Sequence, residues 1–273
     1  EERTMSKSIG RKSIFVTGAA SGIGKATAKL FADRSWFVGL YDIDETGLKT
    51  LAQEIGEENC VWKKLDVRSR EDWAAGMEHF SEATGGKLDV LFNNAGIARH
   101  GWFEAISGED NDLMVDINVK GVLNGVGAAL PLLRNTTGAR IVNTASAAGV
   151  VGGPQMAVYS ATKFAVRGLT EALDVEFSNM GIRVTSLMPW LIDTPILDMF
   201  SGDRTNAKVS DELRDQGQDV YPVELAAERA WDAAHGEEVH YMAGKRAQQA
   251  KFAQRFIPGR LRRQLIKSLP PRA

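Results

Sequence analysis

Short runs of β-branched and other apolar residues alternate with longer amphipathic stretches along most of this 273-residue chain. A short apolar run between turn residues predicts a buried strand, and apolar residues recurring every three to four positions predict a helix. The predicted strands are residues 13–17, 36–41, 60–65, 88–92, 139–144, 182–187 and 239–242; the predicted helices are residues 22–33, 45–55, 70–83, 110–133, 157–179 and 223–234. This alternation predicts an α/β fold, a doubly wound, Rossmann-like parallel sheet with right-handed crossovers and helices on both faces.

The composition is that of a globular protein. Hydrophobic residues make up 44% of the chain and charged residues 25%, which predicts a large buried core rather than disorder. We find no repeat or linker, so residues 13–243 are interpreted as one domain. They follow an N-terminal segment, residues 1–12; one interpretation of the four residues before Met5 is an expression remnant. The formal net charge of −2 gives no reason to expect nucleic-acid binding.

The chain has one cysteine, Cys60, which cannot form an intramolecular disulfide. Free cysteines are usually buried, so we predict a small buried hydrophobe in a strand rather than a reactive thiol. No Cys/His cluster has zinc-ligand spacing, so no metal site is expected.

No apolar run reaches the about 18 residues of a membrane span, and no secretory signal is recognised. We therefore expect a soluble, cytoplasmic protein.

A glycine-rich segment, Thr17-Gly18-Ala19-Ala20-Ser21-Gly22-Ile23-Gly24, links the first predicted strand to the first predicted helix. Its glycines let the backbone turn sharply and approach a pyrophosphate, while exposed N–H groups and the helix dipole favour a bound anion. A tight turn that merely needs small residues is the alternative, but a position between strand and helix at the start of a βαβ unit favours dinucleotide binding. The predicted cofactor-binding residues here are Gly18, Ser21, Gly22, Ile23 and Gly24.

Asp42 ends the second predicted strand, 18 residues beyond Gly24. In dinucleotide-binding folds an acidic residue about 20 residues beyond the turn hydrogen-bonds the adenosine ribose. A carboxylate there would repel a 2′-phosphate, and no arginine stands directly beside it, so the sequence favours NAD over NADP. The alternative is that Asp42 caps the following helix, which Asp44 could do instead.

Tyr159 and Lys163 are four residues apart in a predicted helix, so both lie on one helix face. A nearby ammonium stabilises a phenolate and lowers the pKa of the phenol from its usual value of about 10. Such a phenol can take a proton from an alcohol or give one to a ketone oxygen. Taken alone, a Tyr and a Lys four residues apart on a helix are weak evidence. The alternative is two surface residues with no catalytic role.

Five motifs occur together, in the order and approximate spacing of one enzyme family. They are Thr17-Gly18-x-x-x-Gly22-Ile23-Gly24, Asn93-Asn94-Ala95-Gly96, Asn118, Ser146 and Tyr159-x-x-x-Lys163. With these residues the chain resembles the short-chain dehydrogenase/reductases (SDRs), over roughly residues 13–194 and again near the last predicted strand. The combination is much more specific than any one motif. The resemblance implies an oxidoreductase that moves a hydride between a nicotinamide ring and an alcohol or ketone.

The resemblance implies a catalytic set of Asn118, Ser146, Tyr159 and Lys163. Tyr159 would be the general acid/base and would contact both the substrate and the cofactor, while Lys163 lowers its pKa and holds the nicotinamide ribose. Ser146 would hydrogen-bond the substrate oxygen, and Asn118 would help to hold a water that passes protons from Lys163 to solvent. Taken singly, Ser146 could equally be a helix-capping residue and Asn118 an exposed helical residue.

The resemblance also implies further cofactor contacts. Asn94, Ala95 and Gly96 would pack beside the adenosine ribose. Asp66 and Val67 follow the third predicted strand, where similar proteins contact the adenine ring. For Asp66 the alternative is a turn residue.

The sixth predicted strand is followed by a departure from the family pattern. Similar proteins usually have Pro-Gly and then a Thr that binds the nicotinamide carboxamide. This chain keeps Pro189 and Thr194 but has Trp190 in place of the glycine. We hypothesise that Trp190 forms part of the substrate wall or lid; the alternative is that it shifts the nicotinamide and weakens the cofactor site.

Two regions fall outside the strand–helix alternation. Residues 190–219 are long for a connection, so we predict a substrate lid. Its apolar residues, which are Trp190, Leu191, Ile192, Ile196, Leu197, Met199 and Phe200, suggest a hydrophobic substrate, although packing of the lid on the body explains them equally well.

Residues 244–273 form a basic amphipathic extension with nine Lys or Arg residues and no acidic residue. Packing on the body or on a neighbouring subunit is favoured over contact with an anionic membrane surface.

Three functions remain open from the sequence. The favoured one is an NAD-dependent oxidoreductase that interconverts a hydrophobic secondary alcohol and a ketone. The second is a non-enzymatic NAD-binding sensor or scaffold on the same fold, against which the intact catalytic set argues. The third is an NADPH-dependent ketoacyl-type reductase, which Asp42 disfavours. The resemblance also implies a homotetramer or homodimer.

Overall fold

The computed structural model describes residues 10–200, 209–267 and 269. Within them, seven strands form one parallel sheet in the order β3-β2-β1-β4-β5-β6-β7. The strands are β1 (Ser13–Thr17), β2 (Phe37–Asp42), β3 (Cys60–Lys64), β4 (Val90–Asn93), β5 (Arg140–Thr144), β6 (Arg183–Pro189) and β7 (His240–Ala243). The predicted Rossmann-like sheet is therefore confirmed. The strand order reverses between β1 and β4, which is where ligands bind in such sheets.

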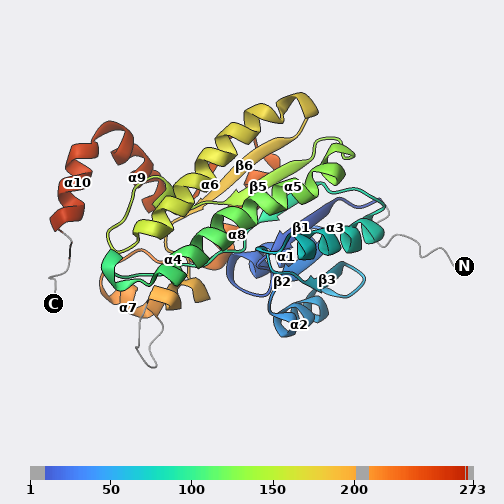
Figure 1. Cartoon of the computed structure of the whole chain (residues 1–273), viewed down its shortest axis with the longest axis horizontal. Helices are drawn as coiled ribbons and strands as arrows, with labels where there is room; N and C mark the ends of the chain where they lie inside the picture. Colours follow the sequence, from blue (N-terminus) through green and yellow to red (C-terminus); the bar gives the residue numbers. More distant parts are fainter. Residues whose placement is uncertain (1–9, 201–208, 268, 270–273) are drawn as a thin grey trace, which may run out of the picture.

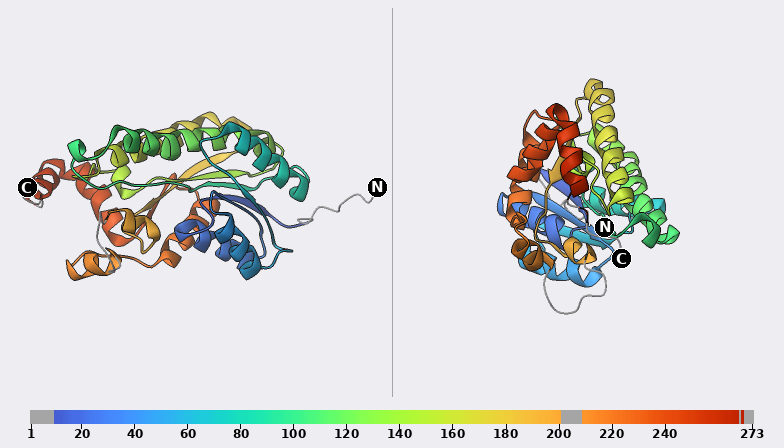
Figure 2. Two further views of the ribbon diagram at one scale, coloured as in Figure 1. Left: turned by 60° about the horizontal axis from the view of Figure 1, so that its bottom comes forward. Right: turned by 90° about the vertical axis from the view of Figure 1, so that its left-hand side faces the viewer.

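Helices cover both faces of the sheet (Figure 1, Figure 2). One face carries α3 (Arg70–Thr84), α4 (Gly108–Val115), α5 (Gly121–Arg134) and α6 (Ala157–Glu176). The other carries α1 (Gly22–Asp33), α2 (Glu45–Ile55) and α8 (Val223–His235). Each layer buries its own hydrophobic cluster against the sheet, as a parallel sheet covered on both faces requires.

The central strand β1 supplies both clusters because successive side chains point to opposite faces. Phe15 belongs to the α3–α5–α6 cluster, where its ring stacks on Tyr41 with 3.8 Å between centroids. Ile14 and Val16 belong to the α1–α2–α8 cluster. Cys60 is buried, as predicted, and lies in this second cluster.

The predicted helix 110–133 is longer and less regular than expected. It runs through α4, a π-helical segment (Asp116–Lys120) and α5 without leaving the helical region. The run Gly108–Arg134 is long and apolar enough to cross a membrane by length and composition, contrary to our expectation, with 39% of its most apolar window buried. A core helix passes the same test; here α5 packs on α3, β4 and β5.

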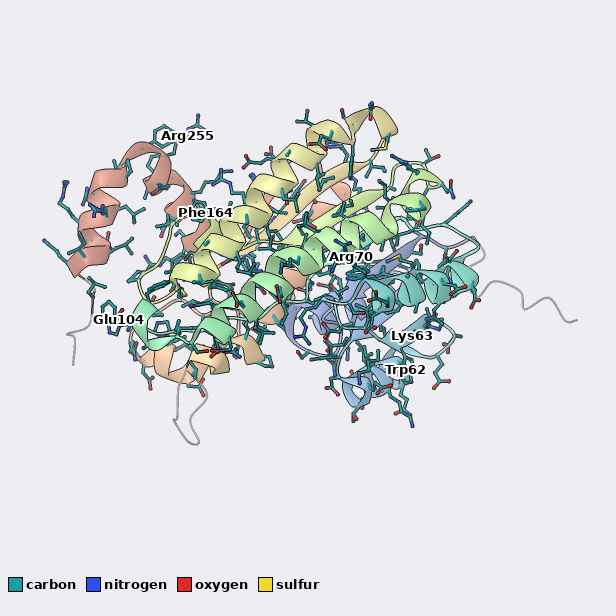
Figure 3. The ribbon with its side chains drawn as sticks, in the orientation of Figure 1. Trp62, Lys63, Arg70, Glu104, Phe164 and Arg255 are labelled. Atoms are coloured by element: carbon teal, nitrogen blue, oxygen red, sulfur yellow. The ribbon has the colours of Figure 1, made fainter. Side chains whose placement is uncertain are left out.

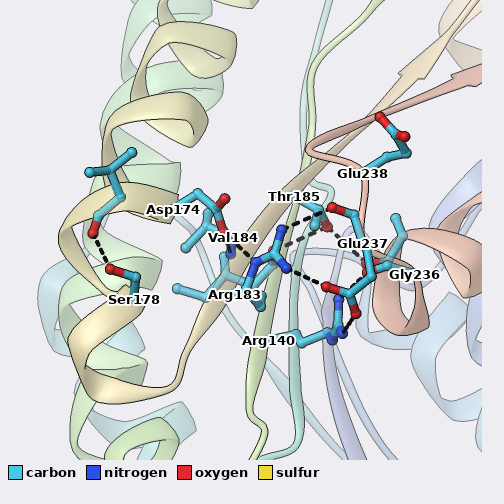
Figure 4. Close-up of polar contacts among 12 residues, drawn as sticks. Arg140, Asp174, Ser178, Arg183, Val184, Thr185, Gly236, Glu237 and Glu238 are labelled. Carbon is cyan, nitrogen blue, oxygen red and sulfur yellow. Dashed lines mark hydrogen bonds and ion pairs between the residues drawn. The ribbon is translucent and has the colours of Figure 1, made fainter.

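Arg183, at the start of β6, ties α6 to the sheet at the edge away from the glycine-rich turn (Figure 4). Its Nε donates to Asp174 of α6 over 2.9 Å, and the Val184 amide donates to the same carboxylate oxygen over 2.9 Å. Its Nη1 donates to Glu237 over 2.6 Å, before β7. These contacts fix one end of α6, the helix whose other end carries Tyr159 and Lys163.

The described part of residues 190–219 contains two short helices, η5 (Pro195–Phe200) and α7 (Val209–Asp215). Arg214 of α7 bonds to Asp193 over 2.7 Å. The predicted lid residues Met199 and Phe200 lie in η5, but their side chains are outside the described residues. The predicted basic extension after β7 contains two helices, α9 (Lys245–Phe256) and α10 (Pro258–Lys267).

Candidate active site

One cleft of about 820 Å³ lies along the carboxyl ends of the central strands. Its wall brings together most of the residues that the sequence singled out, namely Gly18, Ser21, Gly22, Ile23, Asp42, Asp66, Val67, Asn94, Ala95, Gly96, Ser146, Tyr159, Lys163, Pro189, Trp190 and Thr194. The remaining two, Gly24 and Asn118, lie behind the wall and support it. Motifs up to 176 residues apart in the chain thus meet in one cavity.

The glycine-rich turn has the geometry of an anion-binding turn. Gly18 and Gly22 have φ of +66° and +52°, a region that favours glycine. A Cβ on Gly24 would lie 2.0 Å from the carbonyl oxygen of Gly18, so α1 can approach the turn only without a side chain there. Ser21 is the N-cap of α1, yet its side chain makes no capping hydrogen bond. These residues fit a pyrophosphate at the positive end of α1.

Asn94 holds the turn in place from β4. Its Nδ2 donates to the carbonyl of Thr17 over 3.0 Å, and its backbone N–H donates to Thr17 Oγ1 over 3.0 Å. Its Oδ1 accepts from Thr144 Oγ1 at the end of β5 over 3.2 Å. One amide side chain therefore ties three neighbouring strand ends together across the point where the strand order reverses.

Asp42 faces the cleft beside the turn. Its carboxylate accepts from the amides of Ala20 and Asp44 over 3.0 and 3.1 Å. The cap of α2 is Asp44, whose Oδ1 accepts from Gly47 over 3.0 Å. The alternative reading of Asp42 as the helix cap is therefore wrong, because the neighbouring aspartate fills that role.

Asp66 and Val67 line the same end of the cleft. Arg68 pairs with Asp66, its Nε donating over 3.0 Å, which holds the pKa of that carboxyl below its usual range. The Val67 carbonyl accepts from Trp73 and Asn124 over 3.0 and 3.1 Å. This loop is thus held firmly against α3 and α5, and sequence spacing alone had not indicated the Arg68 pair.

Tyr159 and Ser146 meet at the other end of the cleft. Ser146 follows β5 and its Oγ caps the short helix η3 (Ala147–Gly149), accepting from Ala148 over 3.1 Å. The Ser146 hydroxyl is also hydrogen-bonded to the Tyr159 phenol, which lowers the phenol pKa, but burial outweighs it and raises the pKa overall. Ser146 thus has the capping role that the sequence left open and also contacts Tyr159, while its hydrogen bond to the substrate oxygen stays a prediction.

Lys163 lies beside Tyr159 in the cleft. Its Nζ lies 5.7 Å from the Tyr159 ring centroid and donates to the Thr144 carbonyl over 2.8 Å. The side chain is 3% exposed, and burial lowers the pKa of Lys163 to about 8. Desolvation is the main cause of both pKa shifts, and the lowering of the Tyr159 pKa by Lys163 stays a prediction.

Asn118 is buried in the π-helical segment between α4 and α5. Its Oδ1 accepts from the Ile97 amide over 2.9 Å, and its Nδ2 donates to the Ile97 carbonyl over 2.9 Å and to Thr162 Oγ1 over 3.1 Å. It is 1% exposed, so the alternative of an exposed helical residue is wrong. Single-turn π segments commonly occur at functional sites.

Trp190 fits its place without the backbone angles that a glycine allows. Its backbone φ is not positive, and its amide donates to the Ala243 carbonyl over 3.0 Å. Its indole lines the cleft and packs against the α3–α5–α6 cluster. Thr194 lies over the glycine-rich turn, since a Cβ on Gly22 would be 3.3 Å from its side chain.

Several lining residues were not predicted as site residues, among them Ile43, Ile97, Arg99, Leu113, Ile117, Val151, Met156, Leu261 and Leu265. For Leu261 and Leu265 the signal was an i, i+4 apolar pair inside the basic C-terminal segment. Most of the added residues are apolar, so the wall of the cleft as a whole is largely apolar.

A dinucleotide-binding turn that shares one cleft with a half-buried phenol, a half-buried hydroxyl and a buried amine defines a nicotinamide-dependent oxidoreductase. A family model described as short chain dehydrogenase matches residues 12–205. The cyclohexanol dehydrogenase of Acinetobacter sp. (strain SE19) is 35% identical over 202 residues, 73% of this chain and 80% of that protein. The chain belongs to the short-chain dehydrogenase/reductase family and acts, with NAD(P), on CH–OH groups.

Two solved structures have the same fold. The 3-ketoacyl-(acyl-carrier-protein) reductase from Brucella melitensis, complexed with NADH, is 30% identical with a TM-score of 0.76, covering 86% of this chain and 98% of that one. A short-chain dehydrogenase/reductase from Burkholderia phymatum, in complex with NAD, is 26% identical with a TM-score of 0.80, covering 96% of this chain and 98% of that one.

Proposed function

We propose that this protein is an NAD-dependent enzyme that interconverts a hydrophobic secondary alcohol and its ketone. The observation that carries the proposal is one cleft with Asp42 at the adenosine end and Ser146 with Tyr159 at the other, between largely apolar walls. Apolar walls with few polar groups suit an apolar substrate held at one oxygen. The cyclohexanol dehydrogenase among the relatives supports this substrate class.

The preference for NAD rests on Asp42. Two backbone amides fix its carboxylate, which leaves acceptor capacity for ribose hydroxyls. A 2′-phosphate would bring a second negative charge beside it. We expect NADH to bind at least about tenfold more tightly than NADPH, and Asp42→Ser to remove most of this difference. Fluorescence titration of both cofactors measures it; equal affinities in the unchanged protein contradict the preference.

The chain's own groups handle the proton. A bound nicotinamide dinucleotide supplies the hydride acceptor or donor. Tyr159 keeps its proton at neutral pH because burial raises its pKa, so it can protonate a ketone oxygen held by Ser146. In the reverse direction the phenol must first lose its proton, which a higher pH favours. Alcohol oxidation is therefore expected to rise with pH while ketone reduction persists at neutral pH.

NADH absorbance with a panel of cyclic and linear secondary alcohols tests the reaction. Tyr159→Phe is expected to lower turnover by at least about 100-fold, the scale of general acid–base catalysis, with unchanged NADH affinity. Turnover that survives this substitution contradicts the assigned proton transfer. Tight NAD binding without turnover of any alcohol or ketone would instead favour an NAD-binding sensor.

We also propose that the protein is a homo-oligomer. The helical layer of α4, α5 and α6 leaves large apolar side chains at its surface, namely Val115, Leu123, Phe164 and Val175. Phe164 on α6 can be followed in Figure 3. Exposed apolar groups of this size on one layer favour contact with another subunit. Light scattering that gives the mass of a single chain contradicts this proposal.

A further inference from the structure

The last two described helices carry an unusual concentration of positive charge. From Gly244 to the end, the chain has nine of its 33 Lys and Arg residues and none of its 35 Asp and Glu residues, so the rest of the chain has a net charge of −11. Within the described residues, the ion pair of Arg246 with Asp219, over 2.6 Å, is the one that involves this segment. Helices α9 and α10 project from one end of the molecule (Figure 1, Figure 2).

The same helices expose large apolar side chains. Phe252 and Phe256 are 61% and 60% exposed, and their ring centroids lie 4.7 Å apart. Ile257, Ile266 and Leu269 are exposed as well. Five of the eleven exposed large hydrophobic side chains among the described residues therefore lie in this one segment. Arg255, labelled in Figure 3, places its guanidinium 5.6 Å from the Phe256 ring centroid.

The inner side of α10 faces the cleft. Leu261 and Leu265, one turn apart, are half-buried and line the cleft, as does Ala250 of α9. The intervening Arg262 and Arg263 and the following Ile266 are exposed. The helix therefore has one apolar face that closes the cleft and one mixed basic and apolar face turned to solvent.

We propose that the exposed face of α9 and α10 docks on an anionic lipid surface. Helices with aromatic and aliphatic groups among Lys and Arg lie at the interface of anionic bilayers, where the apolar groups enter the headgroup boundary and the cations meet lipid phosphates. The charge contrast within the chain orients this end, rather than the acidic body, toward such a surface. If the substrate is hydrophobic, a point that rests on the proposed function, docking brings Leu261 and Leu265 at the cleft near the lipid phase.

Co-sedimentation of the full chain with vesicles tests the proposal without measuring activity. We compare phosphatidylcholine vesicles with vesicles containing about 30% phosphatidylglycerol, and expect at least about tenfold stronger binding to the second, lost in high salt. Equal binding to both vesicles, or none to either, overturns the proposal. Either result leaves the alcohol and ketone assays unaffected, so the two proposals can fail separately.

Paired variants separate the charges from the aromatic groups. R262Q/R263Q is expected to weaken binding to the anionic vesicles about 25-fold, at about fivefold per cation, and F252S/F256S at least about tenfold. K49Q/K87Q makes the same charge change at two exposed lysines outside the extension and is the matched control. A control variant that weakens binding as much as R262Q/R263Q refutes a specific surface.

Two other occupants of this face are also distinguished. If a second copy of the chain covers it, F252S/F256S lowers the molar mass by light scattering and the unchanged protein does not sediment with vesicles. If the face binds nucleic acid, a single-stranded RNA oligomer shifts the protein in a gel while anionic vesicles do not. Either result overturns the lipid proposal. Unchanged NADH affinity verifies that each variant is folded.

Discussion

Lys163→Met removes a buried ammonium while keeping a side chain of similar length. Burial lowers the Lys163 pKa from 10.5 to about 8, so the folded state binds this proton more weakly than the unfolded state does. The charged lysine therefore destabilises the fold. The destabilisation is complete below pH 8, and stability is regained as pH rises from the folded pKa toward the unfolded value. The variant has no ammonium at this position, so this destabilisation is absent at every pH.

The shift sets the size of the effect. A pKa lowered by about 2.5 units corresponds to about 3 kcal/mol at neutral pH, at about 1.36 kcal/mol per unit. Methionine leaves the Thr144 carbonyl without the 2.8 Å bond from Nζ, which costs about 1 kcal/mol. Lys163→Met is therefore expected to be more stable than the unchanged protein by about 2 kcal/mol at pH 7 and about equal to it near pH 9.5.

Urea denaturation of both proteins from pH 7 to pH 9.5 measures the difference in unfolding free energy. The variant is expected to lose turnover while gaining stability at neutral pH. Lys49→Met makes the same substitution at an exposed lysine and is the matched control. A difference between Lys163→Met and the unchanged protein that stays constant over this range would refute the assignment of a buried, pKa-lowered ammonium.

Three further substitutions test the cleft. Gly24→Ala places a Cβ 2.0 Å from the Gly18 carbonyl, so NADH affinity should fall at least about tenfold and stability by about 1–3 kcal/mol; normal titration and melting curves would contradict this. Asn118→Leu leaves the Ile97 amide and carbonyl unpaired and should cost about 3 kcal/mol in urea denaturation, whereas less than about 0.5 kcal/mol would exclude the bracing role. Trp190→Gly removes part of the cleft wall and should change kcat/KM between bulky and small alcohols at least about tenfold; unchanged substrate preference and unchanged NADH affinity would reject both hypotheses for this indole.

Most of the fold follows from local pattern. The predicted strand 13–17 and helices 22–33 and 45–55 agree with β1, α1 and α2 because their boundaries are marked by local residues, such as Asp44 at the start of α2. The sixth strand runs on to Pro189, two residues beyond the prediction, because its last residues pair with β7. The sequence of β6 does not indicate that it pairs with a strand 54 residues further along the chain.

For the candidate site, too, local sequence predicted some features and tertiary packing decided others. The order of the motifs predicted the glycine-rich turn and the catalytic set, and their side chains do converge on one cleft. The sequence did not predict that Lys163 donates to the Thr144 carbonyl, or that burial raises the Tyr159 pKa. That outcome depends on how deeply both groups are buried, which is a property of the assembled layers.

By itself, the sequence determined the alternation of strands and helices, the turn between β1 and α1, and the one-turn separation of Tyr159 and Lys163. Each depends on residues a few positions apart, whose relative places the helix or strand geometry sets. The tertiary structure alone decided the hydrogen bonds of Asn118 to Ile97 and Thr162, the desolvation that lowers the Lys163 pKa and raises the Tyr159 pKa, and the places of Leu261 and Leu265 in the cleft wall. These features arise where segments distant in the chain pack together, and desolvation and contact exist only after that packing.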